Sequence, residues 1–237
     1  MKERVVTLMW GTAWDRYGKA FVKSFTRYWP SGVELYIVTD RELPTERAVQ
    51  IPLGKVPGYQ DFMGKYYNDR KALGYGQTDH KADPEKRFWK HDAVKWGPQG
   101  LTPRAALDGL TSGDLLCWLD ADVETIAAPP LHWINILLAG ADMACLQRDR
   151  QHSEIGFWAA RIGVGTTQAI KRFAELYESG DVFDLPEWHS GFVFDAALAS
   201  QPDITIHNLS PVGRSHVWPR TPLAQYTVHK KGKIKDK

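Results

Sequence analysis

The segment LLCWLDAD, residues 115–122, joins a run of apolar side chains directly to two carboxylates. The run from Leu115 to Leu119 is typical of a strand that is buried on both faces of a parallel sheet. Asp120 and Asp122 then follow the carboxyl end of this strand, which is where open α/β sheets bind their ligands. The segment therefore predicts a sheet-based fold with a candidate site at this strand end.

The first forty residues have the pattern of a strand, a helix and a second strand. Arg4 to Trp10 is a short apolar and β-branched run, residues 15–29 carry aromatic side chains at helical spacing, and Val33 to Val38 is a buried strand that leads to Asp40. Such a unit forms a parallel pair of strands. Further strands are expected at 48–53, 142–146 and 156–161, and helices at 131–139, 166–178 and 192–198. We expect one α/β domain, residues 1–237, with a Rossmann-like, mixed but mainly parallel sheet flanked by helices.

Two segments do not follow this alternation. Residues 57–100 begin with a stretch rich in Gly, Tyr, Lys and Asp, which predicts an inserted loop or lobe. Helices are expected within 86–96 and 103–111, separated by Gly97-Pro98-Gln99-Gly100. The last segment, 230–237, is basic and is expected to be a mobile tail.

Composition excludes several classes of protein. The 30 Lys and Arg residues against 28 Asp and Glu leave a net charge of +2, so the chain is not a polybasic, histone-like protein. No run reaches the roughly 18 apolar residues that a membrane span needs, and the apolar stretch near the N-terminus is too short for a signal peptide. Two cysteines, Cys117 and Cys145, favour a reducing compartment. These features predict a cytoplasmic protein.

The Asp-x-Asp turn allows two interpretations. Two carboxylates so close together repel each other, and a hard divalent cation relieves this repulsion by taking their oxygens as ligands. The simpler interpretation is a solvated acidic turn, because Asp is common in turns. The position of Asp120 and Asp122 directly after a buried strand favours the metal site.

The order of three segments resembles the glycosyltransferases with the GT-A fold, in particular a bacterial and phage group with an Asp-x-Asp motif. The segments are residues 17–40, residues 115–130 and residues 152–195. This resemblance implies a nucleoside-diphosphate sugar as donor, with a UDP-sugar favoured, and Mn²⁺ or Mg²⁺ as cofactor. It also implies that Asp122 binds the metal, that Asp120 faces the ribose or the metal, and that Asp40 lies near the nucleoside. An ordinary strand-ending role for Asp40 stays open.

His229-Lys230-Lys231-Gly232-Lys233-Ile234-Lys235 is similar to the closing His-x-x-Gly-x-x-Lys motif of several retaining GT-A families. By that resemblance, His229 completes the metal site and Lys235 contacts the diphosphate. A cation and a Lys would stabilise the negative charge that develops on the departing diphosphate. The alternative is a basic tail without such a role.

Several residues are candidates for the group that acts on the acceptor. Ser190 occupies a position where the related group is expected to carry Asp, which leaves Glu187, His189, Glu154 and Asp195 as candidates. Glu187 also has a structural explanation, because a carboxylate is favourable near a helix N-terminus. The choice between retention and inversion stays open.

Residues 64–96 interleave basic and aromatic side chains, a composition that suits phosphates and unstacked bases but equally an exposed, mixed-charge surface. Arg87 and Lys95 in this region are candidates for contacting the donor diphosphate. The candidate acceptors are a saccharide or a hydroxymethylated pyrimidine in phage DNA, where DNA modification would protect against nucleases.

The leading hypothesis is therefore a nucleotide-sugar-dependent hexosyltransferase. Two other classes stay open. One is a sugar-phosphate nucleotidyltransferase, although the turn at Trp10-Gly11-Thr12 lacks the Gly-rich, Arg-containing phosphate loop which that class needs. The other is a non-catalytic module that binds glycan or nucleic acid.

Overall fold

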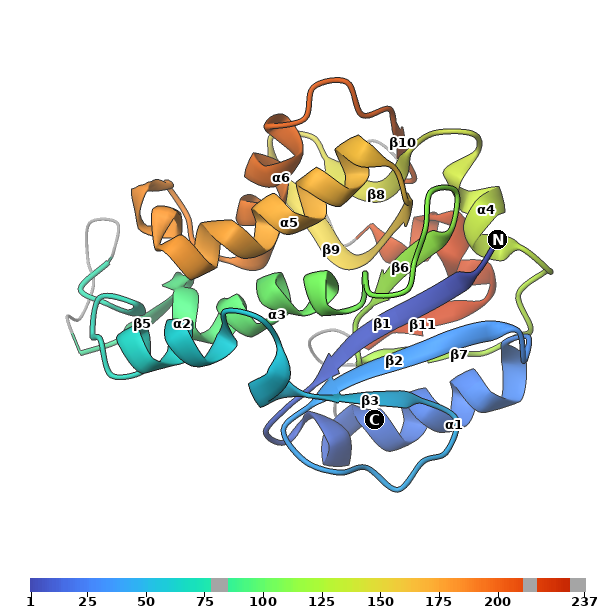
Figure 1. The fold of residues 1–237 in the computed structure, drawn as a ribbon, viewed down its shortest axis with the longest axis horizontal. Coiled ribbons are helices and arrows are strands. Elements are labelled where there is room, and N and C mark those ends of the chain that lie inside the picture. The colour runs from blue at the N-terminus through green and yellow to red at the C-terminus, as the bar shows by residue number, and fades with distance from the viewer. Residues whose placement is uncertain (78–84, 211–216, 231–237) are drawn as a thin grey trace.

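A seven-stranded sheet forms the centre of the molecule, in a computed structural model that describes residues 1–77, 85–210 and 217–230 (Figure 1). Four neighbouring pairs of strands are parallel, and β9 runs antiparallel to both of its neighbours. The strands in spatial order are β10 (Ile206–Asn208), β8 (Met143–Arg148), β9 (Gln151–Arg161), β6 (Leu115–Leu119), β1 (Glu3–Met9), β2 (Val33–Thr39) and β3 (Val49–Pro52). The expected α/β fold with a mixed, mainly parallel sheet is confirmed.

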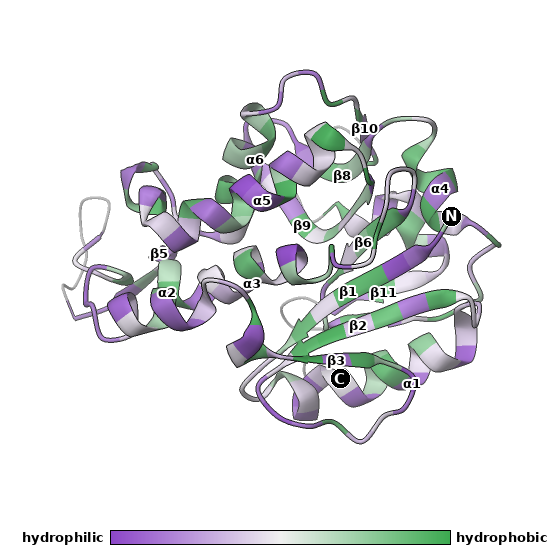
Figure 2. Ribbon diagram, in the orientation of Figure 1, coloured by the Kyte–Doolittle hydropathy of each residue, from purple (hydrophilic) through white to green (hydrophobic). Residues whose placement is uncertain are grey.

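Helices cover both faces of this sheet, and the alternation of side chains along each strand explains why. On β6, Leu116 and Trp118 pack under one group of helices, whereas Leu115 and Cys117 pack on the opposite face. The first group comprises α2 (Tyr59–Tyr66), α3 (Ala93–Ala105), α5 (Val164–Ser179) and α6 (Ser190–Ala199). The second comprises α1 (Lys19–Tyr28) and α4 (Trp133–Leu138). Because both faces are covered, central strands such as β2 are mainly hydrophobic (Figure 2).

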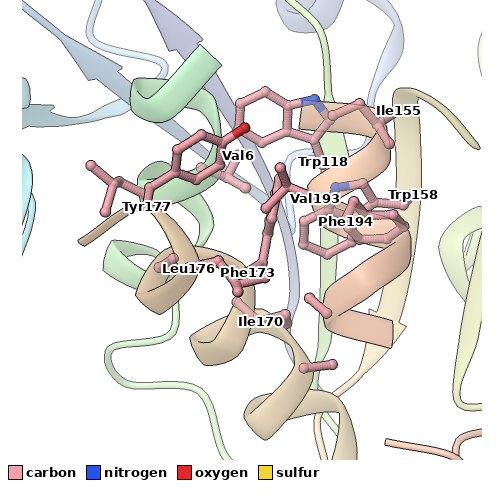
Figure 3. Close-up of a cluster of buried hydrophobic side chains, with 14 of the residues drawn as sticks. Val6, Trp118, Ile155, Trp158, Ile170, Phe173, Leu176, Tyr177, Val193 and Phe194 are labelled. Atoms are coloured by element: carbon pink, nitrogen blue, oxygen red, sulfur yellow. The ribbon is translucent and has the colours of Figure 1, made fainter. Parts of the chain in front are cut away.

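The core on the α5 and α6 face combines aromatic and aliphatic side chains (Figure 3). Trp158 of β9 stacks on Phe194 of α6 with 5.7 Å between ring centroids, and Phe173 of α5 meets Phe194 edge-on at 5.5 Å. Tyr177 is fully buried, and its hydroxyl donates a hydrogen bond to the carbonyl of Trp188 at 2.8 Å. These contacts fix α6, whose N-terminus faces the carboxyl end of β6.

The region 57–105 differs from the sequence expectation. Residues 59–66 form α2, and the segment expected to be helical at 86–96 instead contains β5 (Arg87–Asp92), paired with β4 (Leu73–Tyr75). α3 then runs through Gly97-Pro98-Gln99-Gly100 and ends at Ala105, so the expected break at 97–100 and the expected helix at 103–111 are both wrong.

Close packing explains why α3 continues through two glycines and a proline. A Cβ at Gly97 would lie 2.5 Å from Cε1 of Phe62, and one at Gly100 would lie 2.4 Å from Cε2 of Tyr177. The glycines therefore let α2 and α5 approach α3 closely. The burial gained through these contacts outweighs the low helix propensity of the segment.

Gly100→Ala is expected to destabilise the protein by about 1–3 kcal/mol, because the added methyl group would press against the ring of Tyr177. The hydrogen bond of the Tyr177 hydroxyl group holds that ring in place. The gain in helix propensity, about 1 kcal/mol, offsets only part of this cost. Urea unfolding measures the change. Gly64→Ala in α2 is the control, since a Cβ there meets nothing within 4 Å. Equal effects of the two substitutions would contradict the close contact.

No helix within residues 1–77, 85–210 and 217–230 has both the length and the apolar composition needed to cross a bilayer.

Candidate active site

Asp120, Asp122 and His229 lie together at the carboxyl end of β6. The strand ends at Leu119, the chain turns through the two aspartates, and β7 (Val123–Thr125) then pairs with β11 (Thr227–His229). This pairing brings Nε2 of His229 to 2.9 Å from Oδ1 of Asp122 and 3.8 Å from Oδ2 of Asp120. One ligand atom from each residue lies within 4.8 Å of the others. His229 therefore lies beside the acidic pair, and the expectation that it completes a metal site stays a prediction.

Two side-chain donors orient the carboxylate of Asp120. The Nε1–H of Trp118 donates to its Oδ1 at 2.8 Å, and the amide of Gln99 donates to the same oxygen at 3.0 Å. The hydroxyl of Ser190 donates to Oε1 of Gln99 at 2.7 Å, which sets the orientation of that amide. The chain of hydrogen bonds therefore links the N-terminus of α6 to the acidic pair. Sequence reasoning missed Gln99, because its Gly-Pro-Gln-Gly context indicated a helix break.

The side chain of His229 is fully buried, and two residues define its position. Gly156 of β9 lies against the imidazole, and a Cβ there would be 2.5 Å from Cε1 and 2.9 Å from Nδ1. The ring of Trp218 meets the imidazole edge-on, with 4.7 Å between centroids. Gly156 therefore leaves room for the imidazole of His229. The sequence did not reveal this role, because nothing in it indicated that the two residues are in contact.

A cavity of about 570 Å³ opens beside this cluster, between the carboxyl ends of β1 and β6 and the N-terminus of α6. Asp120, Asp122 and His229 line it. Its other walls include Lys95, Trp96, Glu154, His189 and Ser190. Of the residues expected to act on the acceptor, Glu154 and His189 thus share one cavity with the acidic pair.

Glu187 lies behind His189 and holds it in place. Its Oε2 is 2.8 Å from Nε2 of His189, and its Oε1 is 2.5 Å from the ammonium of Lys90. Burial raises the pKa of Glu187, but the hydrogen bonds from Lys90 and His189 outweigh it, so that the pKa lies below its ordinary value. Glu187 is therefore an ionised, hydrogen-bonded carboxylate at neutral pH.

Both ring nitrogens of His189 are engaged. Nδ1 accepts from the backbone N–H of Phe192 at 3.4 Å at the start of α6, and Nε2 therefore donates its proton to Glu187. Burial lowers the pKa of His189, and the carboxylate of Glu187 offsets only part of that effect. The imidazole is thus neutral at pH 7.

His152 packs against this group, with 4.0 Å between its ring centroid and that of His189. Burial, followed by the charges of His189 and Arg148, lowers the pKa of His152 to about 4. An unfolded chain would protonate this ring near pH 6.5. Between these two values the unfolded state binds more protons, so the free energy of unfolding falls as the pH falls from about 6.5 towards 4.

We expect His152 to contribute on the order of 2 kcal/mol to this loss, a value discounted because its ring is partly exposed to solvent. Urea unfolding of the wild type and of His152→Gln between pH 4 and 7 measures it. The substitution should flatten the pH dependence in that window. Identical curves for the two proteins would contradict the lowered pKa.

The remaining candidates lie in other surroundings. Asp40 accepts a hydrogen bond from the backbone N–H of Gly11 at 2.7 Å and lines a different cavity, of about 370 Å³.

Arg87 donates a hydrogen bond to Asp92 at 2.6 Å. Asp92 in turn caps α3, because its side chain accepts a hydrogen bond from the backbone N–H of Lys95. Burial raises the pKa of Asp195, and two hydrogen bonds from Ser153 offset only part of that rise. Arg87 and Asp195 thus have structural partners.

The tail motif is only partly described. Lys235 and the expected mobile tail from residue 231 onward lie outside the described residues. Lys230 is described: its backbone N–H donates to the carbonyl of Asp122 at 2.9 Å, and its ammonium lies 2.5 Å from Glu124. Lys230, the residue that follows β11, therefore lies beside the acidic pair.

No family model matches the chain, and no curated protein matches it. Among solved structures, it is similar to the apo form of mouse xyloside xylosyltransferase 1, with 10% sequence identity and a TM-score of 0.46, over 89% of this chain and 86% of that chain. It is also similar to two structures of the glycosyltransferase GlyE from Streptococcus pneumoniae TIGR4, one of them an apo form. In both, the identity is 13%, the TM-score is 0.42, and the match covers 88% of this chain and 45% of GlyE.

Proposed function

We propose that this protein is a metal-dependent glycosyltransferase, which moves a sugar from a nucleoside-diphosphate sugar to an acceptor hydroxyl. The observation that carries the proposal is the cluster of Asp120, Asp122 and His229, which lines a cavity at the carboxyl ends of the parallel strands. This is the edge where α/β sheets bind nucleotides. We assign the donor as a hexose nucleotide, with UDP favoured.

The donor set of this cluster fits a divalent cation such as Mn²⁺ or Mg²⁺. Two carboxylates and one imidazole offer oxygen and nitrogen ligands within 4.8 Å of one another. Trp118 and Gln99 hold one oxygen of Asp120 in a fixed direction, and Gly156 leaves room for the imidazole of His229. When bound, the cation would neutralise the charge that develops on the diphosphate leaving group.

The other residues of the cavity have separate roles in the proposal. Lys95 would contact the diphosphate, and the acidic pair would orient it. Glu154 is the candidate to accept the proton of the acceptor hydroxyl, because it lines the cavity together with the acidic pair. His189 and Glu187 would position the acceptor side of the cavity. Asp40 would contact the nucleoside from the separate cavity that it lines.

The acceptor is either a saccharide or, as in phage DNA modification, a hydroxymethylated pyrimidine. The cytoplasm is the proposed location. The thiols of Cys117 and Cys145 support a reducing compartment, since both are buried and free.

The experiment that tests this proposal measures nucleoside diphosphate release from a panel of nucleotide sugars with Mn²⁺ or Mg²⁺. Each donor is tested alone, with saccharides and with duplex DNA that contains 5-hydroxymethylcytosine. Release that needs both the metal and Asp122 supports the proposal. Pyrophosphate formation from a nucleoside triphosphate and a sugar phosphate would instead indicate a nucleotidyltransferase. Ligand binding without any turnover in folded protein would indicate a binding module.

A further inference from the structure

A second cavity, of about 910 Å³, adjoins the cavity that contains the acidic pair. The two cavities share Trp89, Arg148 and His152 in their walls. The second cavity lies between β5, the turn that joins β8 to β9, and α6. A molecule bound there would therefore reach the first cavity directly.

The carboxylates of this second cavity are engaged by their own neighbours. Glu187 is paired with the ammonium of Lys90 at 2.5 Å, and Asp195 accepts from the backbone N–H and the hydroxyl of Ser153 at 2.8 Å and 2.5 Å. The negative charge of Glu187 is thus offset by Lys90, and Asp195 is held against β9. Neither carboxylate forms an ion pair with the arginines in the same walls, although the charge of Arg148 acts on Asp195 and lowers its pKa.

Two arginines supply positive charge and form no ion pair with a carboxylate in the described chain. Arg148 uses only its Nε–H, which donates to the carbonyl of His152 at 2.9 Å. Arg150 is exposed at the turn and makes no hydrogen bond or ion pair with another described residue. Its φ of +54° is a conformation that residues other than glycine rarely adopt, so the turn itself fixes where the side chain leaves the backbone. The guanidinium groups are therefore available to an anion.

Trp89 supplies an apolar surface beside these arginines. Its side chain is 46% exposed although aromatic rings surround it, with centroids at 5.2 Å for His189 and 6.4 Å for both Trp96 and His152. These neighbours hold the indole in place while one part of it stays open. A fixed, half-exposed indole in a cavity wall is suited to stacking on the face of a sugar ring.

We infer that this second cavity binds the acceptor, and that the acceptor is an anionic saccharide whose ring stacks on Trp89 and whose phosphate or carboxylate contacts Arg148 and Arg150. The inference rests on the proposed function and names its acceptor class. Two available guanidinium groups match one anionic group well. A DNA duplex, in contrast, is bound through a row of phosphates that several cations neutralise together. We therefore favour the saccharide over hydroxymethylated DNA.

The test compares matched pairs of ligands by calorimetric titration in the presence of Mn²⁺ and a nucleoside diphosphate. The pairs are hexose 6-phosphates and uronic acids, each with its neutral hexose. The wild type is expected to bind at least one anionic member about tenfold more tightly than its neutral counterpart. Arg148→Gln and Arg150→Gln should each reduce that preference severalfold, and Arg148→Lys should keep part of it. Trp89→Ala should weaken binding of both members of a pair.

Arg27→Gln is the matched control, because Arg27 is an exposed arginine on α1, on the opposite face of the sheet, and it should leave the preference unchanged. Thermal unfolding of each variant checks that it is folded, and Arg150→Gln at an exposed turn keeps the test valid if another variant unfolds. No preference for any anionic member, or a preference that both arginine substitutions leave intact, would overturn the inference. Tighter binding of 5-hydroxymethylcytosine duplex than of every saccharide would overturn it as well.

Donor hydrolysis without acceptor separates the two proposals. Metal-dependent hydrolysis combined with no anionic preference would overturn the acceptor inference alone. An arginine-dependent preference in a protein that never releases nucleoside diphosphate would overturn the proposed function, and the cavity would then be an anion-binding site of another kind.

Discussion

Asp122→Asn is expected to reduce metal-dependent release of nucleoside diphosphate by about a thousandfold or more. The substitution keeps the volume of the side chain but removes the charge of the carboxylate that lies 2.9 Å from His229. Without that charge, the cluster keeps one carboxylate and one imidazole, which bind a hard cation far more weakly. Stabilisation of the departing diphosphate would be lost with the cation. Initial rates over a range of Mn²⁺ concentrations measure the effect.

Binding of Mn²⁺ by calorimetry provides a second measurement that does not depend on turnover, and its affinity should fall in parallel. Asp203→Asn is the control, because Asp203 is exposed and has no hydrogen bond or ion pair with other residues of the described chain. It should leave both rate and affinity unchanged. A rate for Asp122→Asn within tenfold of the wild type would remove the acidic pair from the mechanism.

Gly156→Ala is expected to have the second largest effect, because it acts on His229 without changing any polar group. The added methyl group would lie 2.5 Å from the imidazole, which is fully buried between β9 and Trp218 and cannot retreat freely. We expect a loss of about 1–3 kcal/mol in the free energy of unfolding from overpacking. Displacement of a ligand side chain should also weaken Mn²⁺ binding by about 10- to 100-fold.

A double-mutant cycle with His229→Ala tests the cause of this loss. Once the imidazole is gone, Gly156→Ala should no longer destabilise the protein, and urea unfolding of the four proteins measures the coupling. Gly64→Ala is again the control, since it adds a methyl group that meets nothing within 4 Å. Additive effects of Gly156→Ala and His229→Ala would show that the methyl group acts elsewhere.

The position of the candidate site was predictable because Asp120 and Asp122 directly follow a fully buried strand. A run of apolar residues reports burial on both faces, and burial on both faces predicts a parallel sheet whose carboxyl edge carries the site. The proximity of His229 was predicted from a motif resemblance, and β11 does bring it to the pair. The roles of these three residues as metal ligands stay predictions.

The segment 97–100 shows where local sequence rules fail. Gly-Pro-Gln-Gly has low helix propensity and indicated a break, yet it lies inside α3. The reason is the close approach of Phe62 and Tyr177, which belong to α2 and α5. A packing contact between distant segments leaves no periodic pattern in the residues that make it, so propensity alone predicts the wrong structure.

The sequence by itself determined the first strand–helix–strand unit, the buried strands β6 and β8 with the helices α5 and α6, and the edge that carries two carboxylates, because hydrophobic periodicity is a local record of which side chains are buried. Only the tertiary structure decided how these carboxylates are held and what lies beside them. Gln99 reaches Asp120 across 21 positions of the chain, and Ser190 reaches Gln99 across 91. The clearance at Gly156 and the two available arginines beside Trp89 likewise depend on how separate segments pack, and such contacts exist only once the whole chain has folded.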